Sequence, residues 1–345
     1  METRFSHKEW LSRYDLDINL LDNYHFIVMD VIPLRKVFVL VTDKGNKILK
    51  KVNYTDEDIN FIRSGIDYLK NNGFNRIMDF VLNKDGHIIT QWKKSTYVVM
   101  DLIEGRECEY NNSLDIAIAV NGLADMHKAS KGISFSDKCE RYKGFSLIDN
   151  YKGKLKELEI FKERALSYEN RSEFQEVFLK YVDYFLKAME KSISIIEKSP
   201  YLQLCNDKDN FILCHHDLAY HNIIINDSNS YFIDFDYSII DLRVHDICNF
   251  INKVTKYSCY DFQVLKGIVD EYNRKIPLSQ DEYKILYGML CFPEGFYSIS
   301  KDYFYRKKLW KYESYLYKIE KKVKDIEERE EMIENFRNVY VGAIF

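Results

Sequence analysis

The sequence predicts an α+β protein of two unequal lobes, a small antiparallel β-sheet lobe followed by a larger α-rich lobe. Segments rich in β-branched and aromatic residues fill most of the first hundred positions, as is typical of strands. After Gly105 the pattern changes to apolar residues spaced three and four apart, which indicates amphipathic helices. We therefore expect an N-terminal lobe at residues 1–104 and a C-terminal lobe at 105–345.

Local signals place six strands and one helix in the N-terminal lobe. The strands are expected at residues 25–31, 37–42, 47–52, 77–82, 87–92 and 96–103. A DKGN turn joins the second and third strands as a hairpin. A helix is expected over 55–72, because Thr55 can cap its start and Asn72-Gly73 can end it.

The C-terminal lobe is expected to be helical, with helices over 113–129 and 174–198. A strand-like island at 222–235 interrupts it, where NIII and YFID flank a DSNS turn. The charged tail over 303–337 is also periodic, with apolar residues at Leu309, Tyr312, Leu316, Ile319, Val323 and Ile326. These charged C-terminal helices are expected to dock on the chain's own helical lobe, with a contact to a second copy or to another protein as the alternative.

Composition and charge narrow the possible partners and compartment. The chain has 50 Lys and Arg residues against 54 acids, so no overall basic field attracts nucleic acid or anionic lipid. Its seven cysteines are scattered without a CxxC pair, which indicates reduced thiols. The N-terminal METRFSHKEW has no apolar run, and no run of 18 apolar residues occurs anywhere. We therefore expect no signal peptide, no membrane span, and synthesis in the cytoplasm.

The densest cluster of reactive side chains lies between Cys214 and Phe250 and contains four of the eight histidines. Its HxDxxxxN pattern, a short hairpin and a strand that ends in aspartate are the parts that phosphoryl transfer from a nucleotide needs. We predict a catalytic loop at 214–222, in which Asp217 accepts the hydroxyl proton and His215 orients the loop. The metal ligands for Mg²⁺ are expected to be Asn222 and Asp234, the latter in a strand end at 231–236.

Nucleotide binding also requires a phosphate-binding lysine and a segment that recognises adenine. The strand KILKK offers Lys47, Lys50 and Lys51, and we choose Lys50 because it follows the apolar pair and precedes the turn into the helix. The segment TYVVMDLIEG is typical of the hinge at about 97–104 that joins the lobes of nucleotide kinases. Its expected adenine-binding residues are Met100, Asp101 and Leu102. ATP and Mg²⁺ are therefore the predicted cofactors.

Two other chemistries could use the same cluster. His216-Asp217 and His245-Asp246 suggest an HD-type phosphohydrolase, but those folds are all helical and a strand hairpin separates the two pairs. A zinc site from Cys214 and the nearby histidines would need adjacent ligands to reach one tetrahedral centre. The carboxylates could also simply cap turns.

Several other acidic and histidine residues are expected to have structural roles or are left unassigned. We expect Asp246 to brace the catalytic loop through backbone N–H groups and His127 to be a packed helix residue. The sequence leaves open whether Asp236 and Asp241 approach the metal or are solvated.

These segments resemble the CotS-type spore coat proteins, a family with an aminoglycoside-phosphotransferase-like, protein-kinase-related fold. The match covers nearly the whole chain, through ILKKVNYTDEDINFI, YVVMDLIEGRECEY, CHHDLAYHNIII, IDFDY, DLRVHDICNFI and CFPEGFYSIS. The resemblance implies a bilobal fold with a nucleotide-sized cleft. Carried over by position, it implies Lys50 as phosphate lysine, Asp217 as catalytic aspartate, and Asn222 and Asp234 as magnesium ligands. It also implies association with the coat of a bacterial endospore.

Two departures from kinases of this type bear on activity. VIPLRKV replaces a glycine-rich loop, and no helix glutamate is evident as a partner for Lys50. The expected function is that of a spore coat protein with a kinase-like fold that transfers phosphate from ATP to a hydroxyl of an unknown small molecule, with Asp217 as base. The alternative is a catalytically inactive pseudokinase that serves as a structural or assembly component and binds other coat proteins.

Overall fold

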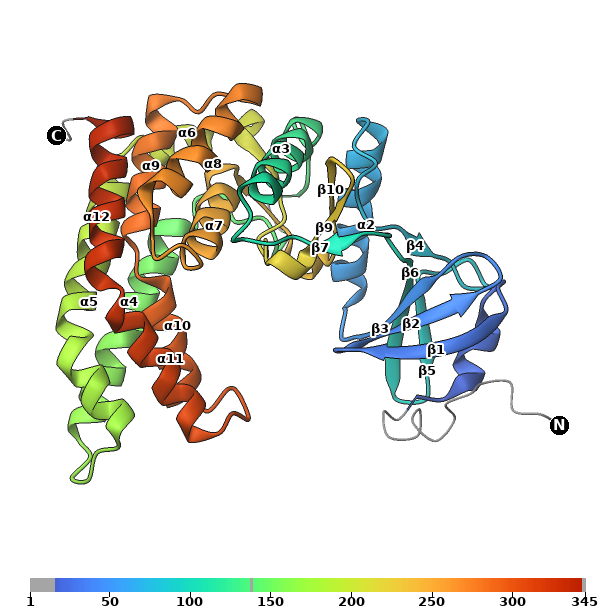
Figure 1. Cartoon of the computed structure of the whole chain (residues 1–345), viewed down its shortest axis with the longest axis horizontal. Coiled ribbons are helices and arrows are strands. Elements are labelled where there is room, and N and C mark those ends of the chain that lie inside the picture. Colours follow the sequence, from blue (N-terminus) through green and yellow to red (C-terminus); the bar gives the residue numbers. More distant parts are fainter. Residues whose placement is uncertain (1–15, 137–138, 343–345) are drawn as a thin grey trace. The chain divides into compact units, whose positions relative to one another are not determined.

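The structure is a computed structural model that describes residues 16–136 and 139–342 (Figure 1). The N-terminal METRFSHKEW segment, on which the expectation of no signal peptide rests, lies outside the described residues. The chain divides into two compact units. The first comprises Met1–Glu107 and His221–Asp236, and the second comprises Cys108–Tyr220 and Tyr237–Phe345.

The first unit is built on an antiparallel sheet. A short helical segment, η1 (Ile18–Asn23), precedes it, and its strands are β1 (Val28–Leu34), β2 (Val37–Thr42), β3 (Lys47–Val52), β4 (Phe80–Val81), β5 (Ile89–Trp92) and β6 (Ser95–Asp101). The strand order is β1-β2-β3-β6-β4, and β5 also pairs with β6. Leu40, Leu49 and Val99 are fully buried in its core, as their alternation along the strands requires.

Helix α2 (Asp56–Asn71) begins where the sequence predicts. The Thr55 side chain accepts the N–H of Asp58, and the Asp58 carboxylate accepts the N–H of Thr55. This capping box satisfies two backbone donors at the helix start, so the predicted cap is confirmed. Three helical positions, Ile62, Ile66 and Leu69, are almost completely buried and form its inner face.

A second, three-stranded sheet also belongs to the first unit. It consists of β7 (Arg106–Glu107), β9 (Ile223–Asn226) and β10 (Asn229–Phe232), in the order β10-β9-β7. Phe232 joins this hairpin to the segment between α2 and β4, since its N–H donates to the Arg76 carbonyl and its carbonyl accepts the N–H of Met78. Residues 231–236, which the sequence assigned to the C-terminal lobe, are therefore grouped with the first unit, whose boundary lies at Glu107.

Gly105 has φ +140°, and a Cβ at this position would lie 2.5 Å from the Ile225 carbonyl oxygen and 2.7 Å from Ile224 Cγ2. We expect Gly105→Ala to lower the free energy of unfolding by about 2 kcal/mol, because backbone strain and overlap act together. Urea unfolding measures the effect. Gly153→Ala is the matched control, since nothing lies within 4 Å of that helical position. Equal midpoints for both variants would contradict the expectation.

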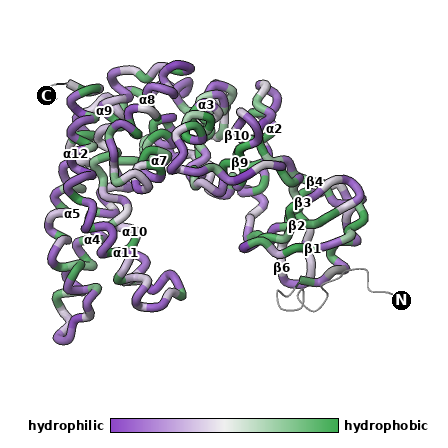
Figure 2. Tube along the Cα trace, viewed as in Figure 1, coloured by the Kyte–Doolittle hydropathy of each residue, from purple (hydrophilic) through white to green (hydrophobic). Residues whose placement is uncertain are grey.

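The second unit is mainly helical. Its elements are α3 (Ser113–Ala129), α4 (Leu147–Leu166), α5 (Glu173–Lys198), α6 (Tyr201–Asn206), η2 (Lys208–Asn210), β8 (Phe211–Cys214), η3 (Tyr220–Asn222, which spans the boundary), η4 (Phe235–Tyr237, likewise), β11 (Ile239–Leu242), α7 (Val244–Thr255), α8 (Phe262–Lys275), α9 (Gln280–Cys291), α10 (Glu294–Phe304), α11 (Tyr312–Lys324), α12 (Ile326–Phe336) and η5 (Arg337–Val341). Figure 1 shows α4 and α5 side by side as a helical hairpin. Hydrophobic colouring gathers on α7 in Figure 2, consistent with its buried face. None of the helices in the described ranges has the length and apolarity to span a bilayer.

The charged tail forms two helices rather than one continuous apolar seam. Asp325 separates α11 from α12, and Leu309 is fully exposed in the segment before α11. Ile319 is fully buried, and α11 packs against α5 and α10. The expected docking on the chain's own helical region is confirmed, whereas a continuous heptad seam that includes Leu309 is wrong.

Candidate functional site

In the first unit, one lysine holds two carboxylates. Lys50 on β3 places its Nζ 2.9 Å from Asp234 Oδ1 and 2.7 Å from Asp236 Oδ2. The Tyr54 hydroxyl donates to the other oxygen of Asp236. The two carboxylates are thus positioned by one ammonium and one hydroxyl group from β3 and the segment that follows it.

The electrostatics of this group leave an excess of negative charge. Burial disfavours the charge on Lys50, but Asp234 and Asp236 outweigh it and raise the pKa of the lysine. Burial and the neighbouring Asp234 raise the pKa of Asp236, although Lys50 opposes them. Two carboxylates against one ammonium suit a divalent cation, because Mg²⁺ is commonly held by one or two carboxylates together with phosphate oxygens.

Asn222 and Asp234 are brought together by the β9-β10 hairpin. The Asn222 carbonyl accepts the N–H of Ile233 at 3.0 Å, so Asn222 lies beside the residue that precedes Asp234. Asp234 has φ +66°, a left-handed conformation that is uncommon outside glycine and is often found at functional sites. The carboxylates of Asp234 and Asp236 and the amide of Asn222 supply oxygen donors of the kind that fits Mg²⁺. The first unit therefore contains both predicted metal ligands and Asp236, which the sequence left open.

The predicted adenine-binding residues have much of their hydrogen-bonding capacity in use. The N–H of Asp101 donates to the Asp79 carbonyl at 3.0 Å, and that of Leu102 donates to the Asn46 carbonyl at 3.1 Å. The Asp101 carboxylate also pairs with Lys47. Met100 lies in β6 opposite Phe80. Two backbone donors of the predicted hinge are therefore engaged inside the first unit.

In the second unit, His215 positions Asp217 through the backbone. His215 is fully buried, and its Nδ1 accepts the N–H of Asp217 at 3.3 Å. The Asp217 carboxylate forms an ion pair with Lys253 of α7. The sequence assigned His215 an orienting role, and this contact gives a direct route for it.

One face of α7 holds the loop that carries Asp217. Asp246 accepts the N–H of His215 at 2.7 Å and that of His216 at 2.8 Å. Asn249 accepts the N–H of Leu218 and donates to the His216 carbonyl. Asp246, Asn249 and Lys253 are spaced three and four residues apart, so they share this face of the helix. The predicted bracing by Asp246 is confirmed.

Asp246 is ionised although it is completely buried. Burial would raise its pKa, but the hydrogen bonds from His127 and from the backbone N–H of His216 lower the pKa to about 2. Burial lowers the pKa of His127, so we assign a neutral imidazole whose Nε2–H donates to Asp246. Its Nδ1 accepts from the Tyr272 hydroxyl at 2.8 Å. The expectation of a packed His127 is confirmed.

A comparison with known protein families tests the resemblance to spore coat proteins. Residues 18–336 match a protein-family model described as spore coat putative kinase YutH. The chain belongs to this family. The likeness to spore coat proteins is therefore confirmed, and the expected location agrees with the family's description.

Relatives of this YutH-family chain agree in sequence and in fold. Spore coat protein S of Bacillus subtilis (strain 168) is 24% identical over 310 residues, which cover 89% of this chain and 88% of the relative. An aminoglycoside phosphotransferase from Alicyclobacillus acidocaldarius has a TM-score of 0.81 at 14% identity, covering 94% of this chain and 96% of that one. Spectinomycin phosphotransferase APH(9)-Ia, solved with ADP and spectinomycin, has a TM-score of 0.66 at 14% identity, with 93% and 97% covered. The predicted bilobal kinase-like fold is confirmed.

Sequence reasoning missed two contacts in this YutH-family chain. Lys253 could have been found, because its spacing from Asp246 puts it on the helix face predicted to brace the catalytic loop. Tyr54 lies in a short connection between β3 and α2, where no periodic pattern marks a side chain that reaches Asp236. All seven cysteines lie in the described ranges and none forms a disulfide, as expected for reduced thiols.

Proposed function

We propose that this chain is a component of the endospore coat that binds ATP with Mg²⁺ and transfers the γ-phosphoryl group to a hydroxyl of a small molecule. The observation that carries this proposal is the contact of Lys50 with both Asp234 and Asp236. A lysine and carboxylates in contact on one unit supply a phosphate-binding cation and metal-binding oxygens together. Synthesis in the cytoplasm and deposition in the coat are part of the proposal.

The site residues of the first unit each have a defined role in this proposal. Asp234 and Asn222 would hold Mg²⁺, with Asp236 as a further oxygen donor, and Lys50 would contact the phosphates. Bound Mg²⁺ would neutralise charge on the phosphates during transfer. Adenine would bind along Met100, Asp101 and Leu102, through groups other than the two N–H donors already engaged.

The transfer step is assigned to the loop that α7 holds. The acceptor's hydroxyl oxygen forms a bond to the γ-phosphorus, the bond from that phosphorus to the bridging oxygen breaks, and ADP leaves. Asp217 takes the hydroxyl proton, while His215 fixes its backbone. Only four residues separate Asp217 from Asn222 in the sequence.

We expect ATP with Mg²⁺ to raise the thermal stability of the chain, because a ligand at 100 times its Kd adds about 2.7 kcal/mol. Asp234→Asn should abolish most of this stabilisation, since it removes a metal-binding carboxylate. The matched control is Asp227→Asn, an exposed turn residue of the same hairpin, in which the shift should persist. A wild-type chain that shows no shift would overturn the proposal.

The pseudokinase alternative is favoured by one observation. Asp58 of α2 caps its own helix, whereas Lys50 pairs with the two aspartates of the proposed metal site. Active protein kinases instead pair this lysine with a carboxylate of the helix. Binding of ATP with Mg²⁺ but no transfer to any compound in an acceptor screen would favour a structural or assembly role in the coat.

A further inference from the structure

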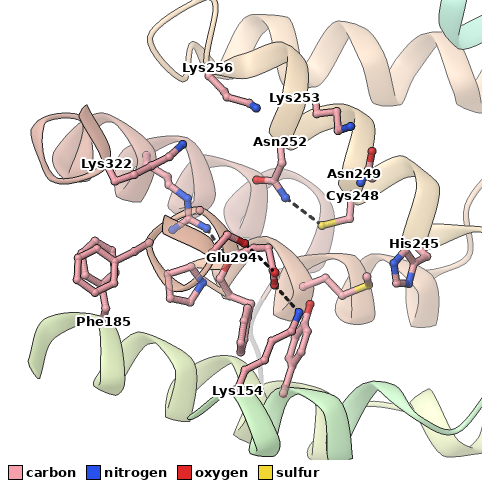
Figure 3. A pocket seen from close by; sticks show the side chains of 18 of the residues that line it. Lys154, Phe185, His245, Cys248, Asn249, Asn252, Lys253, Lys256, Glu294 and Lys322 are labelled. Carbon is pink, nitrogen blue, oxygen red and sulfur yellow. Dashed lines mark hydrogen bonds and ion pairs between the residues drawn. The ribbon is translucent and has the colours of Figure 1, made fainter. Parts of the chain in front are cut away.

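The second unit contains a cavity of about 390 Å³ beside the loop that carries Asp217. Its walls come from α4, α5, α7, α9, α10, α11 and α12 (Figure 3). His216 of the loop also lines it. Lys253 lines the cavity and also contacts the Asp217 carboxylate. Cavities of this size are typical of small-molecule sites. A small molecule in this cavity would therefore lie beside Lys253, the ion-pair partner of the proposed base.

The charge of this cavity is strongly positive. Among the described residues that line it, one has a carboxylate side chain, Glu294, and five have basic side chains, namely Lys154, Lys253, Lys256, Lys322 and Arg329. Glu294 is already paired with Lys154 at 2.7 Å. Lys253 is paired with the Asp217 carboxylate. Lys256, Lys322 and Arg329 have no carboxylate partner among the lining residues.

Lys256 and Lys322 are the two lining lysines without an ion-pair partner among the described residues. They come from the end of α7 and from α11, and Figure 3 shows both side chains extending toward the same hollow. Within the described ranges, neither side-chain ammonium group has a hydrogen bond or an ion pair. Lys256 keeps access to solvent, but the protein atoms around its ammonium, and then Lys322 and Lys253, lower its pKa to about 8. Burial, and then Lys321 and Arg329, also lower the pKa of Lys322.

Two neighbouring groups support a ligand at this position. A Cβ on Gly295 would lie 3.0 Å from Lys322 Cε, so the glycine lets the lysine side chain lie close against α10. His216 contributes a buried Nδ1 with no hydrogen-bond partner among the described residues. Buried polar atoms normally have a hydrogen-bond partner, so this nitrogen can accept a hydrogen bond from, or donate one to, a molecule in the cavity.

We infer that this cavity is the acceptor site and that the acceptor carries an oxyanion group, a carboxylate or a phosphate ester, in addition to its reacting hydroxyl. The inference rests on the proposed function. The oxyanion would pair with Lys256 and Lys322, while the hydroxyl lies toward Asp217 and Lys253. An acceptor with amino groups, such as the spectinomycin bound by the related phosphotransferase, would instead meet unbalanced like charges.

Four sugars of matched shape test the charge preference on the full chain without nucleotide. Glucose 6-phosphate and glucuronate represent the two oxyanions, glucose is neutral and glucosamine is cationic. Calorimetry should show at least one oxyanion binding more than about tenfold tighter than glucose, and weakening as salt screens the charges. The tighter of the two identifies the oxyanion. Binding of glucosamine or glucose as tight as both anions, or no binding of either anion or of inorganic phosphate, would overturn the inference.

Lysine variants locate the binding. Lys256→Met and Lys322→Met should each reduce anion affinity about tenfold or more. Lys324→Met, on the same helix as Lys322 but not lining the cavity, is the matched control and should bind normally. The two cavity variants should melt no lower than the wild type, since each removes an unpaired cation. Equal loss of affinity in the control would overturn the inference.

The two proposals fail in different ways. Anion binding to the second unit needs no ATP and should be unchanged in Asp234→Asn. A chain that binds anions through Lys256 and Lys322 but shows no response to ATP with Mg²⁺ would overturn the proposed function. A chain that transfers phosphate to amino sugars but not to oxyanion sugars would overturn the charge preference alone.

Discussion

Asp217→Asn should reduce phosphoryl transfer by about 10² to 10⁴-fold while ATP with Mg²⁺ still stabilises the chain. Asparagine has nearly the same size, so the backbone contact to His215 should survive. It cannot take the hydroxyl proton, and it loses the ion pair with Lys253. Release of ADP in the presence of an oxyanion sugar measures the rate, and a thermal shift measures nucleotide binding.

The matched control for this variant is Asp183→Asn. That side chain is 64% exposed on α5 and pairs with Lys162, and exposed ion pairs of this kind contribute little to stability. Its transfer rate should equal that of the wild type. Transfer by Asp217→Asn at the wild-type rate would show that Asp217 is not the base.

Asp246→Ala should lower the free energy of unfolding by about 3 kcal/mol or more, because the buried N–H groups of His215 and His216 lose their acceptor. Cooperative urea unfolding at neutral pH measures this loss. Asp183→Asn again serves as the control and should change the midpoint little. A small effect of Asp246→Ala would mean that another group or water takes over these donors.

The same carboxylate predicts a pH dependence. Its folded-state pKa of about 2 lies below the ordinary value of 3.8, so its contribution is complete above about pH 4 and is lost as the pH falls toward 2. This contribution is worth about 2 kcal/mol. Asp246→Asn should therefore lose stability less steeply than the wild type in this acid range. Parallel acid titrations of the two proteins would contradict the assignment.

Elements with strong local signals were predictable from the sequence. Strands β2 and β3 have the predicted bounds because a turn signal separates two β-branched runs, and α3 has its predicted bounds. The tail was not predictable to the same degree, because apolar spacing continues through Asp325 although the helix does not. The spacing of apolar residues indicates which helix face is buried. The break at Asp325 depends instead on tertiary packing, in which α11 packs against α5 and α12 packs against α8.

The sequence indicates which residues form the candidate site, but it does not show which of their side chains are in contact. The HxDxxxxN pattern identifies the loop, yet the partner of Lys50 lies 184 residues away at Asp234 and no local rule connects them. No sequence pattern marks Lys256 and Lys322, and only the tertiary structure brings them to the wall of one cavity. The acceptor preference that we infer therefore depends on tertiary contacts that sequence patterns do not show.

The hairpin β9-β10 has a consequence for how the chain is made. The first unit is discontinuous, since His221–Asp236 completes a unit that begins in Met1–Glu107. On a ribosome that adds about 5–20 residues per second, on the order of ten seconds pass between synthesis of its two parts. During that interval Lys50 lacks its aspartate partners and β7 lacks its neighbouring strand β9. The first unit can finish folding only after more than half of the chain has emerged.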